Sequence, residues 1–188
     1  MVSAGEPTLE LDSMQSWLKA SGAAGLEGVE LANFPIAGRG LEALRHFKKG
    51  ERILTIPHSV LWTVENAYSD PLLGPILRSV RPSLSVDDTL AIYILFVQSQ
   101  KSGYDGRRSH VAALPASYSS SIFFTKEELE VCAGTSLHTI TKQLELQIGD
   151  DYKELLRRLI EPNRDLFPLE KFAIEDVSIL HAWSRRYT

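Results

Sequence analysis

The spacing of apolar residues changes partway along this 188-residue chain, and that change constrains the fold more than any other feature. In the first third, short runs with strand propensity alternate with glycine turns, and these runs are Val29–Ile36, Leu41–Arg45, Arg52–Ile56 and Val60–Thr63. From about residue 70 onward, apolar residues recur every three or four positions, which is the period of an amphipathic helix. The pattern predicts a small sheet of short strands followed by a larger helical region.

Several helices of this pattern have recognisable ends. A first helix over Leu9–Leu18 precedes the strands, and Gly22 is placed to end it. Asp70 and Pro71 open a short helix. Ser85 is an N-cap for a helix that runs to about Lys101 and is apolar nearly all round, so it is expected to be a buried hub. Residues 103–108 are predicted to form a loop.

The sharpest local signal lies in the second half of the chain. Thr125 and Glu128 form a capping box at the start of a helix. After Gly134 the apolar stripe continues to Pro162, either as one long helix or as two helices broken near Gly149. A last helix begins near Phe172 and has no glycine or proline after it, so the chain is expected to be a piece of something longer.

The composition is that of a soluble globular protein, with 44% apolar and 23% charged residues. The net charge of −4 argues against direct nucleic-acid binding, and the longest apolar stretch, Leu90–Val97, is too short to span a membrane. The single cysteine, Cys132, is expected to be a buried structural thiol. The chain start shows no secretion signal, so a cytoplasmic or nuclear location is expected.

Motif searching identifies no catalytic centre. Gly38-Arg39-Gly40 lacks the third glycine of a dinucleotide site and the lysine of a P-loop, so it is interpreted as a strand turn whose backbone could grip a ligand. The five histidines have no metal-binding spacing, and no nucleophile elbow is present. Arg185 either stabilises a helix C-terminus or binds a carboxylate with its planar fork.

The order of these motifs resembles one family. Strand and turn motifs resemble the N-terminal SET segment of the Rubisco large-subunit methyltransferase-like class of SET-domain proteins, and they are Gly38–Ala43, Lys49–Pro57 and Leu61–Thr63. Later motifs are similar to that class's helical insert and to the helix that returns to its catalytic half, and they are Ala113–Pro115, Phe123–Leu129, Gly134–Leu137, Ile174–Val177 and Ala182–Arg185. The resemblance extends from about Met14 to Thr188.

The resemblance implies an α+β fold, in which a small β-strand SET segment precedes a larger α-helical insert subdomain. The corresponding divisions are an N-terminal helix and lead-in at 1–28, the SET β segment at 29–64, the helical insert at 65–172, and at 173–188 the start of the helix returning to the C-terminal SET half.

The class transfers methyl groups from S-adenosylmethionine to protein side chains, usually lysine. By resemblance, Ala37, Gly38 and Arg39 would contact the cofactor through their backbone, and Arg185 would hold its carboxylate. Several relatives carry an acid where this chain has Ala37. The class completes its site with an Asn-His pair and a tyrosine C-terminal to the Ser-Arg helix, and this sequence contains no Asn-His. No residue is therefore assigned as catalytic, and the chain alone is expected to be truncated and inactive, with weak or absent cofactor binding.

The expected partner is a protein carrying a target lysine, of the ribosomal-protein, translation-factor or histone class; the sequence leaves open whether the target is lysine or histidine. A different reading is a non-catalytic protein-interaction module derived from a SET protein. A third is that another chain supplies the remaining half, as in a swapped dimer. Apolar surface left uncovered would promote self-association.

Overall fold

The computed structural model describes residues 7–35, 38–100, 103–114 and 120–172, and the chain divides into two compact units. The first unit comprises Met1–Leu61 and Asp105–Ala113, and the second comprises Trp62–Tyr104 and Leu114–Thr188. The described elements are helices and one two-stranded sheet, so the predicted α+β class is confirmed. The predicted segment boundaries near residues 28, 64 and 172 stay predictions.

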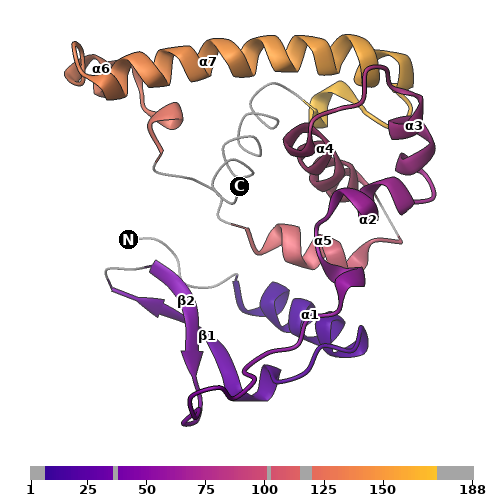
Figure 1. Ribbon diagram of the computed structural model, residues 1–188, viewed down its shortest axis with the longest axis vertical. Coiled ribbons are helices and arrows are strands. Elements are labelled where there is room, and N and C mark those ends of the chain that lie inside the picture. The colour runs from indigo at the N-terminus through magenta and orange to yellow at the C-terminus, as the bar shows by residue number, and fades with distance from the viewer. Residues whose placement is uncertain (1–6, 36–37, 101–102, 115–119, 173–188) are drawn as a thin grey trace. The chain divides into compact units, whose positions relative to one another are not determined.

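The first unit is a β-hairpin with two helices (Figure 1). Strands β1 (Val29–Phe34) and β2 (Gly38–Ala43) pair antiparallel, with Val29 opposite Ala43 and Phe34 opposite Gly38. Helix α1 (Pro7–Ala20) packs on α5 (Asp105–Ala112). The hairpin therefore shares its unit with a helix pair that joins distant parts of the sequence.

The contact between α1 and α5 depends on a glycine. A Cβ atom at Gly106 would overlap the indole ring of Trp17, so only glycine lets the two helices approach this closely. The Ser13 and Ser109 hydroxyls hydrogen bond across the same contact at 2.8 Å. The predicted loop at 103–108 was wrong, because packing on α1 makes residues 105–112 helical without a strong helical pattern of their own.

Two of the predicted strands do not form. Arg52–Ile56 contributes a single bridge, between Thr55 and Ala24, in place of a strand. The pairing does not continue beyond this bridge because the chain turns at Gly25, which has φ +85°. Gly25 lies so close to Ile53 that a Cβ at Gly25 would overlap the Ile53 carbonyl oxygen. The predicted extended piece Val60–Thr63 was also wrong, since Val60 ends a 3₁₀ turn (His58–Val60) and Thr63 caps the next helix.

The second unit is helical throughout its described part (Figure 1). Helices α2 (Val64–Ser69) and α3 (Leu73–Ser79) pack on each other and on α4 (Val86–Ser99). Two further helices follow, α6 (Lys126–Val131) and α7 (Ser136–Leu155). Its described residues also include one π turn (Leu156–Ile160) and three 3₁₀ turns, which are Ser121–Phe123, Glu161–Asn163 and Leu169–Lys171.

Helix α4 is the buried hub that its sequence predicts. The Ser85 hydroxyl caps it by accepting a hydrogen bond from the Asp88 amide at 3.0 Å, and every residue from 91 to 97 is buried. The rings of Phe96 and Phe167 lie 6.2 Å apart between centroids, and those of Phe167 and Phe172 lie 5.1 Å apart at right angles. All three phenylalanines are fully buried, so the segment before residue 172 closes the core over α4.

The capping box before α6 and the long stripe after it are confirmed. The Thr125 amide donates to Glu128 Oε2 at 2.8 Å, and the Glu128 amide donates to Thr125 Oγ1 at 3.2 Å. Helix α7 runs without a break through Gly149, so the stripe forms one helix and not two. Of the last predicted helix, only Phe172 lies within the described residues.

Candidate functional site

The predicted cofactor-binding residues centre on Gly38, at the start of β2. Gly38 has φ +75°, a left-handed conformation that glycine adopts at little cost, and its backbone pairs with Phe34 in the hairpin. Among the described residues, and apart from its chain neighbours, no atom lies within 4 Å of the position where its Cβ would be, so the space on that side of Gly38 is open. The predicted turn over Gly38-Arg39-Gly40 is displaced, because all three residues belong to β2 and the chain reverses before them.

The other predicted site residues are described only in part. The backbone of Arg39 pairs with Asn33 in the hairpin, whereas nothing is described of its side chain. Ala37 and Arg185 lie outside the described residues. Of this predicted site, the structure thus describes Gly38 and the backbone of Arg39, and the roles assigned to all four residues stay predictions.

The hairpin presents apolar side chains beside this opening. Leu41, two residues after Arg39 on β2, is 57% exposed. The ring of Phe34 lies against Gly40, where a Cβ would come within 3.1 Å of Phe34 Cε2. A two-stranded sheet is marginally stable by itself, so these exposed groups indicate a surface that gains stability when covered.

A second polar cluster, which sequence reasoning missed, surrounds Asp70. Its Oδ1 accepts hydrogen bonds from the amides of Leu72 and Leu73 at 3.0 and 2.9 Å, which caps α3. The Tyr104 hydroxyl donates to both carboxylate oxygens, at 3.1 and 2.9 Å. Asp70 and Pro71 signal a helix start in the sequence, but Tyr104 is 34 residues away and lies within the segment predicted to be a loop. No local pattern could have paired them.

A pocket of about 520 Å³ borders this cluster, between α4 and the residues that follow the 3₁₀ turn at 161–163. Its polar lining includes Tyr104 and Lys171, whose side chains are already engaged by Asp70 and by the Ser99 carbonyl. Because a nucleophile and its base must be available to a substrate, this pair supplies no catalytic couple. The Asp70 cluster is therefore structural.

The Asp70–Tyr104 pair predicts a loss of stability at alkaline pH. Burial, and then the hydrogen bond and charge of Asp70, raise the pKa of Tyr104 well above its ordinary value. The unfolded chain then loses this proton at a lower pH than the folded chain, so the stabilisation is complete below about pH 10 and declines as the pH rises above it. Urea unfolding at several alkaline pH values should show a smaller decline in Tyr104→Phe than in the matched Tyr68→Phe. Equal declines in the two variants would contradict the assignment.

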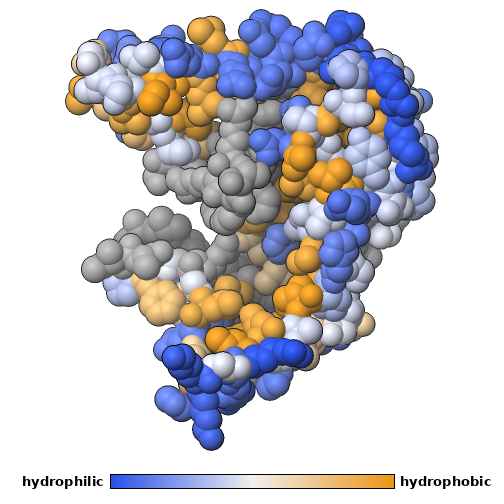
Figure 2. Space-filling model, in the orientation of Figure 1, coloured by the Kyte–Doolittle hydropathy of each residue, from blue (hydrophilic) through white to orange (hydrophobic). Residues whose placement is uncertain are grey.

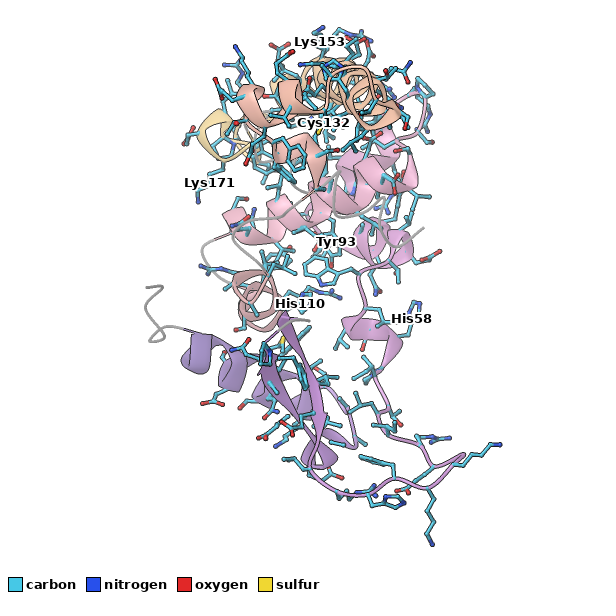
Figure 3. The ribbon with its side chains drawn as sticks, turned by 90° about the vertical axis from the view of Figure 1, so that its left-hand side faces the viewer. His58, Tyr93, His110, Cys132, Lys153 and Lys171 are labelled. Carbon is cyan, nitrogen blue, oxygen red and sulfur yellow. The ribbon has the colours of Figure 1, made fainter. Side chains whose placement is uncertain are left out.

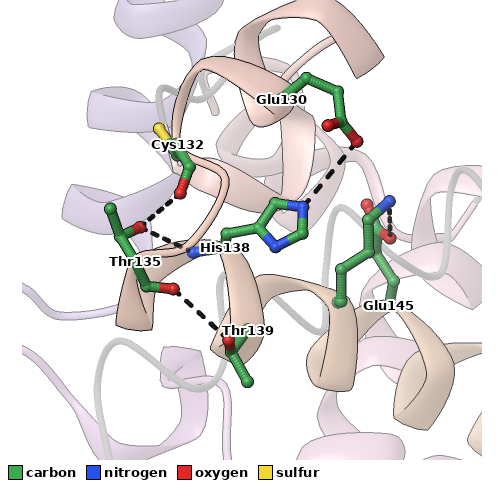
Figure 4. Close-up of polar contacts among 7 residues, drawn as sticks. Glu130, Cys132, Thr135, His138, Thr139 and Glu145 are labelled. Carbon is green, nitrogen blue, oxygen red and sulfur yellow. Dashed lines mark hydrogen bonds and ion pairs between the residues drawn. The ribbon is translucent and has the colours of Figure 1, made fainter.

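The corner between α6 and α7 holds a further cluster of polar groups (Figure 4). Thr135 caps α7 by accepting from the His138 amide at 3.3 Å, and His138 Nε2 lies 3.9 Å from Glu130 Oε1. Cys132, labelled in Figure 3, ends α6 and is partly exposed. Its predicted burial was wrong because α6 ends there, before Cys132 can turn into the core. Within the described ranges, no three histidine, cysteine or acidic residues gather to hold a metal ion.

The described helices include none that combines the length and apolar character needed to cross a bilayer.

No family model matches the chain, but individual proteins do. It is 28% identical over 173 residues to the actin-histidine N-methyltransferase of Xenopus tropicalis, which aligns with 87% of this chain. It is also 28% identical over 166 residues to the chloroplastic Rubisco large-subunit N-methyltransferase of Pisum sativum, again with 87% of this chain covered. The chain spans 28% and 32% of the length of these two relatives.

Comparison with solved structures identifies the fold. The SET domain of the Rubisco methyltransferase LSMT, bound to lysine and AdoHcy, superposes with a TM-score of 0.76 over 92% of this chain and 38% of that one, at 20% identity. The structure of Rubisco LSMT bound to AdoMet gives a TM-score of 0.76 at 19% identity. The family resemblance in the sequence is thereby confirmed: this chain is similar in sequence to the actin-histidine and Rubisco large-subunit N-methyltransferases, and it shares the fold of part of the Rubisco enzyme's SET domain.

Proposed function

We propose that this chain forms the cofactor-facing first portion of an S-adenosylmethionine-dependent protein N-methyltransferase. The observation that carries the proposal is the superposition on the LSMT SET domain over 92% of the chain, at a TM-score of 0.76. It is supported by the sequence relation to two N-methyltransferases that act on actin and on Rubisco. The partner is then a protein substrate.

The residues of the hairpin fit such a cofactor. Gly38 has no side chain and open space where its Cβ would be, so a ligand can approach its backbone closely from that side. Arg185 would hold the carboxylate of the methionine part through two parallel hydrogen bonds. When bound, the cofactor supplies an electrophilic methyl group. The protein's part is to position it and to keep water away from the acceptor nitrogen.

The acceptor is proposed to be lysine, as in the Rubisco enzymes. Lysine and histidine both attack through a neutral nitrogen, so the glycine turn and the arginine suit either acceptor. The test incubates a protein extract with radiolabelled cofactor and the enzyme that contains this chain. Amino-acid analysis of the methylated proteins should then find the label in methyl-lysine. Label in methyl-histidine would assign the enzyme to the actin type instead.

Isothermal calorimetry with S-adenosylmethionine tests the cofactor site. The 188 residues include no Asn-His pair, so we expect weak binding and no turnover by this chain alone. Arg185→Ala should weaken the binding further, because the carboxylate loses its fork, while the neighbouring Arg186→Ala should leave it unchanged. Equal effects of the two variants would mean that both arginines only stabilise a helix end. Tight binding would refute the expectation that the cofactor site of this chain is incomplete.

A non-catalytic interaction module is the second candidate. It is favoured by large apolar residues left exposed on α6 and α7, which are Val131, Leu137, Ile140 and Leu146. Complete absence of cofactor binding, together with capture of a protein partner that Ile140→Lys abolishes, would favour this function. The cytoplasmic or nuclear location stays a prediction.

A further inference from the structure

The segment after β2 concentrates positive charge in a chain that is acidic as a whole. Residues 45–52, here named the basic loop, hold four of the chain's 20 lysines and arginines and a single acid, Glu51, whereas the whole chain has a net charge of −4. Hydrophilic side chains gather beneath β1 and β2 in the space-filling view (Figure 2). Scattered cations are expected on any solvated surface. The contacts that the cations make within the basic loop therefore decide whether it is a binding site.

The basic loop is held in one conformation by Glu51. The Lys48 amide donates to Glu51 Oε2 at 2.9 Å, and the Glu51 amide donates to the Lys48 carbonyl at 3.0 Å. Glu51 Oε1 also lies 2.6 Å from Arg45 Nη1, and the Arg45 guanidinium stacks 4.0 Å from the centre of the Phe47 ring. The Lys48 amide and then Arg45 lower the pKa of Glu51, so these contacts persist at neutral pH. Arg45 is thereby committed to the loop itself.

The other three cations of the loop are uncommitted. Lys48, Lys49 and Arg52 are exposed, and none forms an ion pair within the described part of the chain. Three cations on α7 and the π turn after it differ, because each pairs with an acid three residues away, and these pairs are Lys142–Glu145 at 3.2 Å, Lys153–Asp150 at 2.8 Å and Arg157–Glu154 at 2.8 Å. Acids therefore neutralise these three cations locally, whereas Lys48, Lys49 and Arg52 of the basic loop have no such partner among the described residues.

Apolar side chains flank the basic loop on both sides. Leu44 precedes it and is 53% exposed, and Ile53 follows it and is 47% exposed. Nucleic-acid binders present a basic stripe along the phosphate backbone, whereas here three cations occupy one turn of an acidic chain. A short acidic peptide that also carries apolar residues matches both the charge and the flanks.

We propose that the basic loop docks an acidic, partly apolar segment of a partner protein. That this partner is the methylation substrate rests on the proposed function. Exposed ion pairs are individually weak and are screened at high salt, so binding is weak and salt-dependent. The contacts of Glu51 reduce the entropy lost on binding, since the loop backbone is already ordered.

Fluorescence anisotropy with a labelled twelve-residue peptide of glutamate and leucine tests the docking site. Lys48→Glu/Lys49→Glu should weaken binding about tenfold, because two attractive pairs become repulsive. The matched reversal Lys142→Glu/Lys153→Glu, on α7, should change it less than about twofold. Replacing glutamate by glutamine in the peptide should abolish binding. Equal losses in the two double variants, or unchanged binding by the loop variant, would overturn the proposal.

Two further measurements separate the possible failures. A labelled oligothymidine that binds more tightly than the acidic peptide would refute a protein partner. Calorimetry with S-adenosylmethionine on the same loop variant should match the unmodified chain, because the proposed cofactor contacts lie in other residues. Peptide docking without cofactor binding would retain the docking site and refute the methyltransferase proposal, and cofactor binding without peptide docking would do the reverse. Circular dichroism shows whether each variant is folded. If Lys48→Glu/Lys49→Glu misfolds, Lys48→Gln/Lys49→Gln takes its place in both measurements.

Discussion

Replacing Phe167 with alanine is expected to lower the free energy of unfolding of the second unit by about 3–5 kcal/mol, the usual range for a fully buried phenylalanine. Phe167 is fully buried, and its ring contacts those of Phe96 and Phe172, at 6.2 and 5.1 Å between centroids. Its loss would leave a cavity where the segment before residue 172 closes over α4. The effect is large because two aromatic contacts are lost together with the buried area.

Urea unfolding followed by far-ultraviolet circular dichroism measures the effect. Leu169→Ala is the matched control, since Leu169 lies in the same segment and is 38% exposed. It should cost less than about 1 kcal/mol, because most of its transfer free energy is not gained on folding. A loss below about 1 kcal/mol for Phe167→Ala would mean that this segment does not close the core as described.

Asp70→Ala is expected to cost about 2–3 kcal/mol, because one carboxylate accepts all the hydrogen bonds of its cluster. Asp70 is only 7% exposed, and its removal would leave the Leu72 and Leu73 amides and the Tyr104 hydroxyl without their acceptor. Asp70→Asn keeps one oxygen for the helix cap and should lose about half as much. Tyr104→Phe removes a single donor and should lose less than Asp70→Ala.

Amide hydrogen exchange at Leu73 reports on this cap directly. Its protection should fall strongly in Asp70→Ala and slightly in Asp70→Asn, since Oδ1 of Asp70 is its acceptor at 2.9 Å. Unchanged protection in Asp70→Ala would show that water or another group replaces the carboxylate, and the cluster would then contribute little to α3.

The features that the sequence predicts are those whose physical cause is local. Ser85, Thr125 and Glu128 cap helices through atoms three residues away, and the spacing alone reveals them. The missed features depend on distant residues. Helix α5 forms where Gly106 admits Trp17, and the strand expected at 52–56 is interrupted where Gly25 turns. Neither contact can be predicted from the spacing of residues, because the partners are far apart in the sequence.

The candidate site likewise has one part that follows from a local sequence signal and another that depends on distant residues. The left-handed conformation of Gly38 follows from glycine's conformational freedom, and the structure places this residue at the start of β2, opposite Phe34, and not in the middle of a turn. The roles of Ala37, Arg39 and Arg185 came from family resemblance, because no spacing in the chain connects residues almost 150 positions apart. The Asp70–Tyr104 pair had no sequence signal for the same reason.

The proposal that the hairpin contacts S-adenosylmethionine is tested most directly by nuclear magnetic resonance of the isotope-labelled chain during titration with that cofactor. The amide signals of Gly38, Arg39 and Gly40 should shift progressively, as expected for weak binding, while those of α6 and α7 should stay in place. Gly38→Val, which adds a branched side chain where the backbone is open, should abolish the shifts, and Gly50→Val, in the basic loop, should preserve them. Unmoved hairpin signals at the highest cofactor concentration, or shifts confined to the second unit, would contradict the account.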